Sequence, residues 1–546
     1  MKMVSQKEKQ KSWQEPRRLC FIILVLYLLI PSASHAADKF NFNNFTEVRI
    51  DGLDRKNMLR LIHMGIDIEG LRKHPTGISS KGKLSVRAYI GSEQIEELRK
   101  MGYEVSSVPH PLKRNPSLRQ GYHTYSELTS ELQAIESAHP DICRLYNIGK
   151  SAQGRELWFM KISDNVDAEE DEPEFKYISS MHGDETVGME LCLKLIRLLA
   201  EGYGNDARIT HLLDEIEIWI MPLMNPDGYE NGSRYNSEGA DLNRGFPDRV
   251  SDPNNTTEGR SPEIQHVMNW GFEHSPVLSA NFHTGAAVVN YPYDSDPDKW
   301  ADVSFTPDKE LFIQQAMSYA SLNSRMVNNP EFSDGITNGL KWYPVYGGMQ
   351  DWNYVWMGCN EVTIELCDNK WPAYSEIETL WEENKEAMLA YMAWCLRGVR
   401  GVVRDSVTGV PLNASVSVVD PAHENDHENA HNVYTDPDVG DYHRMLLPGT
   451  YSLLFSAEGY DSKTISDVAV GETEAVRADV EMISIVSGDI NKDGRADLAD
   501  CILILRILTG KEMPLSFDKN DKKRDWDGDR KLGIGDVVYI LRDLSK

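Results

Sequence analysis

The stretch Pro173-Glu-Phe-Lys-Tyr-Ile-Ser-Ser-Met-His-Gly-Asp-Glu185 decides how the rest of the sequence is interpreted. Its first half has the composition of a buried strand, and it runs into a loop that carries His182 and Glu185. An imidazole and a carboxylate three residues apart can both turn towards one cation, and nitrogen plus oxygen donors suit zinc. The stretch therefore offers two metal ligands, and a third must come from elsewhere in the chain.

Length and composition limit the kind of protein. A chain of 546 residues is too long for one hydrophobic core, so several domains are expected. Acidic residues outnumber basic ones by 85 to 57, which gives a formal charge of -28. This balance disfavours nucleic acid as a partner and suits a soluble protein or one that binds cations. The few cysteines are too sparse for a disulfide scaffold, so hydrophobic cores must hold the domains together.

Residues 1–36 have the pattern of an export signal. Basic residues precede an apolar run from Leu19 to Ile30, and the small residues Ser34 and Ala36 follow. The run is too short to cross a bilayer comfortably, and the small residues suit a signal peptidase. We expect cleavage, no stable membrane span afterwards, and export to the extracellular space, the periplasm or the cell surface. An uncleaved membrane anchor is the alternative.

Three segments between residues 38 and 483 differ in pattern. Residues 38–115 alternate strand and helix periods twice, which predicts a small α+β unit. This unit ends in a proline-rich linker with the dibasic pair Lys113-Arg114, so it is either an accessory domain or a removable pro-segment. Residues 116–398 alternate strands with helices, which predicts an α/β domain with a mixed central sheet. Residues 399–483 contain five or more short strands, which predicts a small β-sandwich.

Residues 485–546 contain two acidic loops, each followed by an apolar helix. Both loops carry side-chain oxygens at the spacing of calcium-binding loops, and Gly494 stands at the turn position of the first. Arg530 occupies that position in the second loop, so we expect weaker calcium binding there. The candidate calcium ligands are Asp489, Asn491, Asp493, Asp497 and Asp500 in the first loop and Asp525, Asp527, Asp529 and Asp536 in the second. The segment resembles the dockerin module, which implies a cohesin-like protein as partner.

Three further sequence patterns provide candidate catalytic and binding residues within residues 116–398. An apolar strand from Leu278 to Phe282 leads into His283, a third ligand type at a strand end. A second pattern begins at Arg234 and ends in Asn243-Arg244. The third contains Tyr343 and Gly347-Gly-Met-Gln-Asp and is followed by the strand Val362-Thr-Ile-Glu365-Leu.

Together these patterns resemble the zinc metallocarboxypeptidases over about residues 120–397. The similarity is closest to the regulatory branch, which includes carboxypeptidases D, E, M and N and carries a transthyretin-like β-sandwich after the catalytic domain. Residues 399–483 correspond to that β-sandwich. The motifs that carry the resemblance are His182-Gly-Asp-Glu185, Asp241-Leu-Asn-Arg244, His283, Gly347-Gly-Met-Gln-Asp and Thr363-Ile-Glu365-Leu.

The resemblance implies a role for each catalytic residue. His182, Glu185 and His283 would bind one zinc ion and leave a fourth position to water, the arrangement for which carboxypeptidase A is a standard example. Glu365 would act as the general base for that water. Arg234 would stabilise the oxyanion that develops on the scissile carbonyl.

The resemblance also implies how a substrate is chosen. Asn243 and Arg244 would bind the free terminal carboxylate, and Tyr343 would close over the bound chain end. Asp294 aligns with the acid that gives the regulatory branch its preference for terminal Lys or Arg, and Gln350 takes the pocket-floor position. The implied function is a secreted zinc carboxypeptidase specific for basic chain ends.

Two other functions remain open from the sequence. One is a peptidase of the same fold that acts on cell-wall peptides or another acyl-amino acid, which should lack the Asp294 feature. The other is a calcium-dependent assembly or adhesion protein that carries a vestigial catalytic domain.

Overall fold

The computed structural model describes residues 45–73, 84–109, 115–419, 431–486, 488–491, 493–509 and 533–545. The expected signal peptide, the Lys113-Arg114 pair and the second-loop residues Asp525, Asp527 and Asp529 lie outside these ranges. Among the described residues, no helix is long and apolar enough to cross a membrane. The chain divides into Met1–Asn41 and Phe42–Lys546, and the described residues all belong to the second part.

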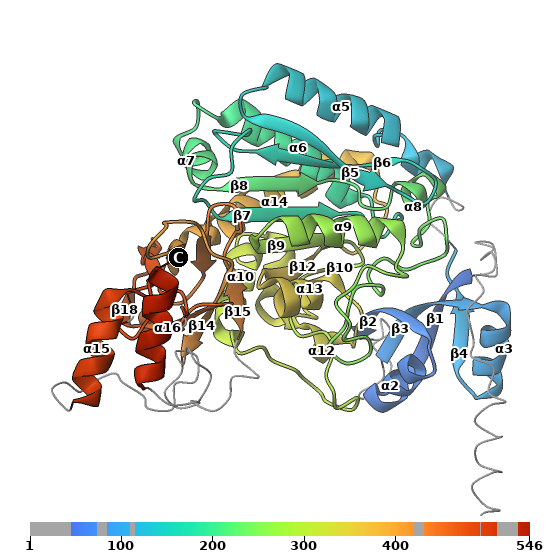
Figure 1. Cartoon of the computed structure of the whole chain (residues 1–546). Coiled ribbons are helices and arrows are strands. Elements are labelled where there is room, and N and C mark those ends of the chain that lie inside the picture. Colours follow the sequence, from blue (N-terminus) through green and yellow to red (C-terminus); the bar gives the residue numbers. More distant parts are fainter. Residues whose placement is uncertain are drawn as a thin grey trace, which may run out of the picture. The chain divides into compact units, whose positions relative to one another are not determined.

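The amino-terminal unit is a four-stranded antiparallel sheet with two helices (Figure 1), as the sequence predicts. The side chain of Asp54 caps the first helix by accepting from the N–H of Asn57. The strand order is β2-β3-β1-β4, and residues of both helices pack with β1 and β3 in one hydrophobic core. The elements are β1 (Phe45–Leu53), α2 (Arg55–His63), β2 (Asp67–Lys73), β3 (Leu84–Gly91), α3 (Ser92–Lys100) and β4 (Glu104–Ser107).

An eight-stranded mixed sheet forms the centre of the domain that follows the amino-terminal unit. Its order is β11-β10-β12-β9-β7-β8-β6-β5, and β12, β9, β7 and β8 run parallel to one another. The carboxyl ends of β7, β9 and β12 therefore meet at one edge, which is where α/β sheets place their sites. The strands are β5 (Cys143–Lys150), β6 (Glu156–Ile162), β7 (Glu174–Ser179), β8 (Glu217–Met221), β9 (Pro276–His283), β10 (Ala286–Tyr291), β11 (Ile336–Asn338) and β12 (Asn360–Cys367).

Helices cover both faces of this sheet. Alternation along β7 sends Phe175 and Tyr177 into one core and Ile178 into another. The first core includes side chains of α5, α6, α7, α10 and α14, and the second includes side chains of α9 and α13. The helices are α5 (Tyr125–Ala138), α6 (Val187–Gly202), α7 (Ala207–Glu215), α8 (Pro226–Asn231), α9 (Pro262–Glu273), α10 (Lys309–Ala320), α11 (Ser324–Val327), α12 (Gly339–Trp342), α13 (Met349–Trp352) and α14 (Ile377–Met392).

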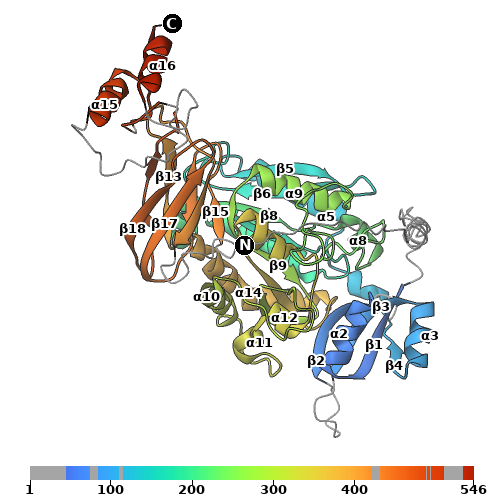
Figure 2. The same ribbon diagram turned by 60° about the horizontal axis from the view of Figure 1, so that its bottom comes forward.

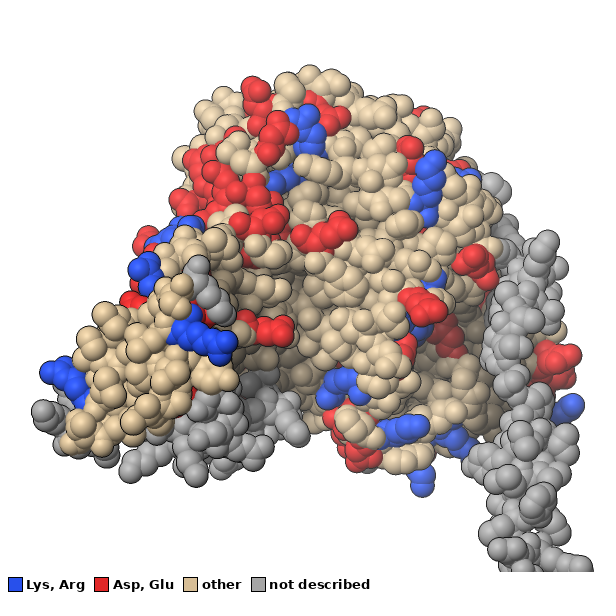
Figure 3. Space-filling view, in the orientation of Figure 1, with Lys and Arg blue, Asp and Glu red and all other residues tan. Residues whose placement is uncertain are grey.

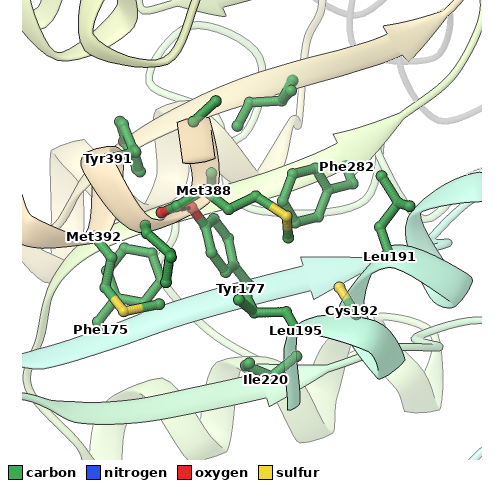
Figure 4. Packing of buried hydrophobic residues seen from close by; sticks show 14 of the residues in the cluster. Phe175, Tyr177, Leu191, Cys192, Leu195, Ile220, Phe282, Met388, Tyr391 and Met392 are labelled. Atoms are coloured by element: carbon green, nitrogen blue, oxygen red, sulfur yellow. Dashed lines mark hydrogen bonds between the residues drawn. The ribbon is translucent and has the colours of Figure 1, made fainter. Parts of the chain in front are cut away.

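The larger core fixes β7, the strand that leads to His182 and Glu185. Figure 4 shows Tyr177 and Phe282 packed against side chains of α6 and α14. The hydroxyl of Tyr177 donates to the carbonyl of Met388 at 2.9 Å, so its polar end is satisfied inside the core. The loop after β7 therefore starts from a rigid base.

Residues 399–483 form a two-sheet sandwich (Figure 2), which confirms the predicted β architecture. One sheet has the order β16-β13-β19, with β20 also paired to β13, and the other has the order β15-β14-β17-β18. The strands are β13 (Val399–Asp405), β14 (Ala414–Val419), β15 (Asn432–Tyr434), β16 (Asp441–Arg444), β17 (Gly449–Ala457), β18 (Lys463–Val470), β19 (Val476–Arg477) and β20 (Val480–Met482).

The carboxy-terminal segment contributes two packed helices. These are α15 (Leu498–Leu508) and α16 (Ile534–Leu544), and they share a small core with Ile490. The cysteines within the described residues are free and buried. Hydrophobic burial therefore holds these domains, in agreement with the sparse cysteines.

Candidate active site

Three candidate zinc ligands meet at the carboxyl edge of the central sheet. His182 and Glu185 follow β7, and His283 ends the neighbouring parallel strand β9. The Nδ1 atoms of the two histidines lie 3.0 Å apart, and the Glu185 oxygens lie 3.0 and 2.8 Å from them. Each residue is 3% exposed, and the ligand atoms lie within 4.8 Å of one another. Two nitrogens and one carboxylate converging in this way fit zinc.

A carboxylate behind the cluster orients His182. Asp241 Oδ1 lies 3.1 Å from His182 Nε2, which holds the proton on that nitrogen and leaves Nδ1 free for a metal. Asp241 also accepts from Arg234 at 2.8 Å, and Arg234 Nη1 lies 3.2 Å from His182 Nδ1. The sequence places Asp241 in a motif but gives it no role, and its function as an orienting group emerges only from these contacts.

Glu365 lies beside the cluster on β12, directly opposite His283 on β9. Its side chain is buried, and its Oε2 atom has no hydrogen-bond partner among the residues that the structure describes. Burial, followed by the charges of Glu185 and Glu69, raises the pKa of Glu365 well above its usual range. The carboxyl group is therefore held in the site with one oxygen free.

Asn243, Arg244 and Tyr343 line the same cavity as the three candidate metal ligands. This cavity also includes Arg234 and Glu365 in its wall. Asn243 is fixed by the N–H of Met349, which donates to its Oδ1 at 3.1 Å. The structure thus brings together the residues that the sequence assigns to catalysis and to recognition of a chain end.

The proposed specificity acid lies deeper in this cavity. Asp294 is 4% exposed, and its Oδ1 accepts from Asn290 and from Gln350, each at 3.2 Å. Asp351 accepts from the N–H of Asp294 at 3.0 Å. Burial and the charge of Asp351 raise the pKa of Asp294 well above its usual range. An incoming cation would relieve both effects.

Strand β2 of the amino-terminal unit places two further carboxylates in this site. Alternation sends Ile66 and Ile68 into the core of that unit, so Asp67 and Glu69 occupy the opposite face. Glu69 is part of the wall of the active-site cavity. Sequence analysis missed both acids, because it did not identify β2.

The two acids contact the arginines expected to bind substrate. Glu69 Oε2 lies 3.5 Å from Arg234 Nη1, and Asp67 Oδ2 lies 3.7 Å from Arg234 Nε. Asp67 Oδ1 lies 3.5 Å from Arg244 Nη2, which also donates to the carbonyl of Ile68 at 3.2 Å. Carboxylates of the chain itself therefore lie where a substrate carboxylate is expected.

Lys370, another residue that the sequence did not single out, neutralises this region. Its Nζ lies 2.5 Å from Glu69, 3.2 Å from Glu185 and 3.3 Å from Asp184. Burial would lower the pKa of Lys370, but these carboxylates raise it well above its usual range. Burial would likewise raise the pKa of Glu69, but Lys370 and Arg234 lower it. Both groups stay charged, and no motif spacing in the sequence indicates the pair.

The first calcium-type loop folds back on itself. Asp489 accepts from the N–H groups of Asp493 and Gly494, and Asp500 accepts from that of Asn491. Gly494 has a φ of +85°, a conformation that favours glycine at the turn position. Of the second loop, the structure describes Asp536, which is buried at the start of α16. The loops stay predicted calcium sites.

Comparisons with known proteins agree with this geometry. The family described as zinc carboxypeptidase matches residues 128–387, and the carboxypeptidase regulatory-like domain matches residues 398–483. Human carboxypeptidase D is 41% identical over 396 residues, which cover 68% of this chain and 28% of the relative. The chain thus spans little more than a quarter of that protein.

Two other similar proteins are matched over most of their own length. Carboxypeptidase SOL1 of Arabidopsis thaliana is 40% identical over 377 residues, which cover 69% of this chain and 75% of the relative. The crystal structure of carboxypeptidase A from Helicoverpa armigera superposes with a TM-score of 0.51 at 18% identity, covering 64% of this chain and 96% of that one. At that identity the structural match shows a common fold.

Proposed function

The chain belongs to the zinc carboxypeptidase family, and we propose that it hydrolyses the carboxyl-terminal peptide bond of peptides or proteins. The observation that carries this proposal is a single buried cavity. It contains the His182, Glu185 and His283 cluster, the free carboxyl oxygen of Glu365 and the pair Asn243 and Arg244. Metal ligands, a base and an anion-binding pair are what carboxypeptidase chemistry requires.

The roles of the residues follow from their chemistry. Zinc bound by the three ligands supplies Lewis-acid chemistry that activates water and polarises the scissile carbonyl. Glu365 takes a proton from the attacking water and delivers it to the leaving amine. Arg234 donates hydrogen bonds to the carbonyl oxygen as negative charge develops there, and Asp241 holds the guanidinium in place.

Asn243 and Arg244 make the enzyme act at chain ends. A guanidinium presents two parallel donors that match a carboxylate, and the asparagine adds an amide donor. Tyr343, which lines the same cavity, closes over the bound residue. An internal peptide bond offers no free carboxylate to this pair, so the site favours exopeptidase action.

Asp294 and Gln350 support a preference for terminal Lys or Arg. A buried carboxylate that has no cationic partner gains most from a cationic side chain, because the pair forms away from water. A neutral substrate side chain would leave Asp294 unpaired. The preference therefore depends on Asp294 being ionised when substrate is bound.

We also propose that residues 38–115 act as a pro-segment. Support comes from Asp67 and Glu69, which contact Arg234 and Arg244, and from the apolar packing of the unit against Trp342, Tyr343 and Val345. A substrate carboxylate must displace the two acids before it can reach the arginines. The dibasic pair Lys113-Arg114 offers a cleavage point in the linker.

The two ends of the chain suggest where the protein acts and what it binds. We propose that residues 1–36 direct export and that the carboxy-terminal module binds one or two calcium ions and a cohesin-like partner. Exposed apolar side chains on both helices support a docking role, among them Leu498, Leu505, Ile534 and Val538. Chelation of calcium should lower the helical circular dichroism signal of the full chain without loss of peptidase activity.

A substrate panel tests the catalytic proposal. The chain cleaved after Arg114 should release the last residue from a peptide ending in arginine, with slower cleavage of the same peptide ending in phenylalanine. An amidated arginine peptide should be a poor substrate because it offers no anion to Arg244. Equal cleavage of free and amidated peptides would point to an endopeptidase and overturn the proposal.

A further inference from the structure

A second buried polar cluster lies where the catalytic domain meets the β-sandwich. Asp171 belongs to the loop before β7, whereas Asp441 and His443 belong to β16. Each residue offers one ligand atom, and these atoms lie within 4.8 Å of one another. Asp441 is 4% exposed and His443 is 5% exposed. The three residues therefore have the proximity of a metal-binding group, with Asp441 and His443 buried and Asp171 partly buried.

Each of the three also has a buried atom for which the described residues offer no hydrogen-bond partner. Asp171 Oδ2 pairs with Arg477 at 2.6 Å, and Asp441 Oδ2 lies 2.8 Å from His443 Nε2. Asp171 Oδ1, Asp441 Oδ1 and His443 Nδ1 are buried without a hydrogen-bond partner. A buried polar atom left without a partner costs free energy, so these three atoms indicate a missing ligand.

The surroundings of the cluster are strongly acidic. Asp441 and His443 line a small cavity together with Glu172, Glu174 and Asp436. Acidic side chains gather near α7 and the start of β7 and β8 (Figure 3). Burial, together with the charges of Asp436 and Asp171, raises the pKa of Asp441. A divalent cation would neutralise carboxylates that otherwise repel one another.

We propose that Asp171, Asp441 and His443 bind a divalent cation of the zinc class, which ties the catalytic domain to the β-sandwich. The imidazole nitrogen distinguishes this site from a calcium site, which takes oxygen ligands. With Nε2 of His443 held by Asp441, Nδ1 is the nitrogen free to bind. None of the residues that line this cavity lines the active-site cavity, so the cation would have a structural role.

The test counts metal ions on the full chain. The protein is stripped with a chelator and returned to buffer with calcium, so that the carboxy-terminal loops are filled, and is then titrated with zinc chloride. Calorimetry and elemental analysis should give two zinc equivalents per chain, one for the His182 cluster and one for the new site. A single equivalent would overturn the proposal.

Variants assign the second zinc to this site. Asp441→Asn and His443→Gln should each weaken the second binding step by more than about tenfold while leaving the first unchanged. Asp438→Asn, which removes the same charge from an exposed neighbour, should keep both equivalents. Unchanged zinc binding in His443→Gln, or replacement of the second zinc by calcium, would contradict the proposal that a nitrogen of His443 binds the cation.

Crystals of the unaltered chain provide a second measurement if the variants fail to fold. Soaked in zinc chloride, they should show two anomalous peaks at the zinc edge. One peak should lie among His182, Glu185 and His283, and the other among Asp171, Asp441 and His443. Absence of the second peak would rule out the site.

Discussion

The active site and the junction between the domains both bury several carboxylates, but they balance the charge differently. In the active site Arg234 contacts Asp241 and Glu69, and Lys370 contacts Glu69 and Glu185. At the junction Arg477 contacts Asp171, while Asp441 and His443 keep buried atoms without partners. The active site contains arginine and lysine side chains that can pair with the carboxylate of a substrate. The junction has too few cationic side chains for its carboxylates and therefore favours a bound metal ion.

The largest expected effect concerns Glu365, the proposed general base of the active site. Glu365→Gln should lower turnover by about 100- to 10,000-fold, because the amide cannot accept the proton from water. Zinc content should stay at the unaltered value, since Glu365 is not among the proposed ligands. Comparison with Glu185→Ala, which should lose zinc as well as activity, separates the two roles. Near-normal turnover of Glu365→Gln would require another base.

Asp294 tests whether an unpaired buried acid sets specificity. Asp294→Asn should reduce kcat/KM for peptides ending in arginine by about 100-fold relative to those ending in a neutral residue. The unaltered enzyme should also show a pH effect of definite sign. Because the pKa of Asp294 is raised, the group is neutral at low pH, so the preference for arginine should grow as pH rises. A preference independent of pH and of this substitution would exclude Asp294.

The junction should show a smaller effect, on stability. Burial and neighbouring acids raise the pKa of Glu169 to about 9 and that of Glu172 to about 8, and both residues line the junction cavity. These carboxyl groups bind protons more tightly in the folded chain, so its stability should fall as pH rises from about 5 to 9. Thermal unfolding of the metal-free chain should show this decline, and zinc should flatten it. If the stability of the metal-free chain did not change with pH, this result would contradict the proposed excess of buried carboxyl groups at the junction.

The sequence predicts the parts of the molecule that depend on local patterns. Apolar runs locate β7, β9 and β12, and the polar residues at their ends become neighbours because the strands are parallel and adjacent. Strand β2 was missed because Asp67-Ile-Glu-Gly-Leu-Arg-Lys73 contains four charged residues and a glycine, which are uncommon in strands. Its carboxylates reach Arg234 only through packing between domains, which no local pattern records.

The same limit explains why the sequence does not indicate the cluster at the junction or the contacts of Lys370. Asp171 and His443 are far apart in the sequence, and neither belongs to a motif with metal-ligand spacing. Lys370 follows β12 in a short loop without distinctive neighbours. In each case the three-dimensional fold, and not the spacing, creates the cluster.

If residues 38–115 act as a pro-segment, the active site is complete but blocked by Asp67 and Glu69. The most direct test compares hydrolysis of an arginine-ended peptide by the uncleaved chain and by Asp67→Asn/Glu69→Gln, with Glu97→Gln as a control for an exposed acid of the same unit. The double variant should be at least about tenfold more active, because neutral amides release the two arginines. The control should match the unaltered chain. Equal activity of all three proteins, at the level of the chain cleaved after Arg114, would show that these acids do not block the site.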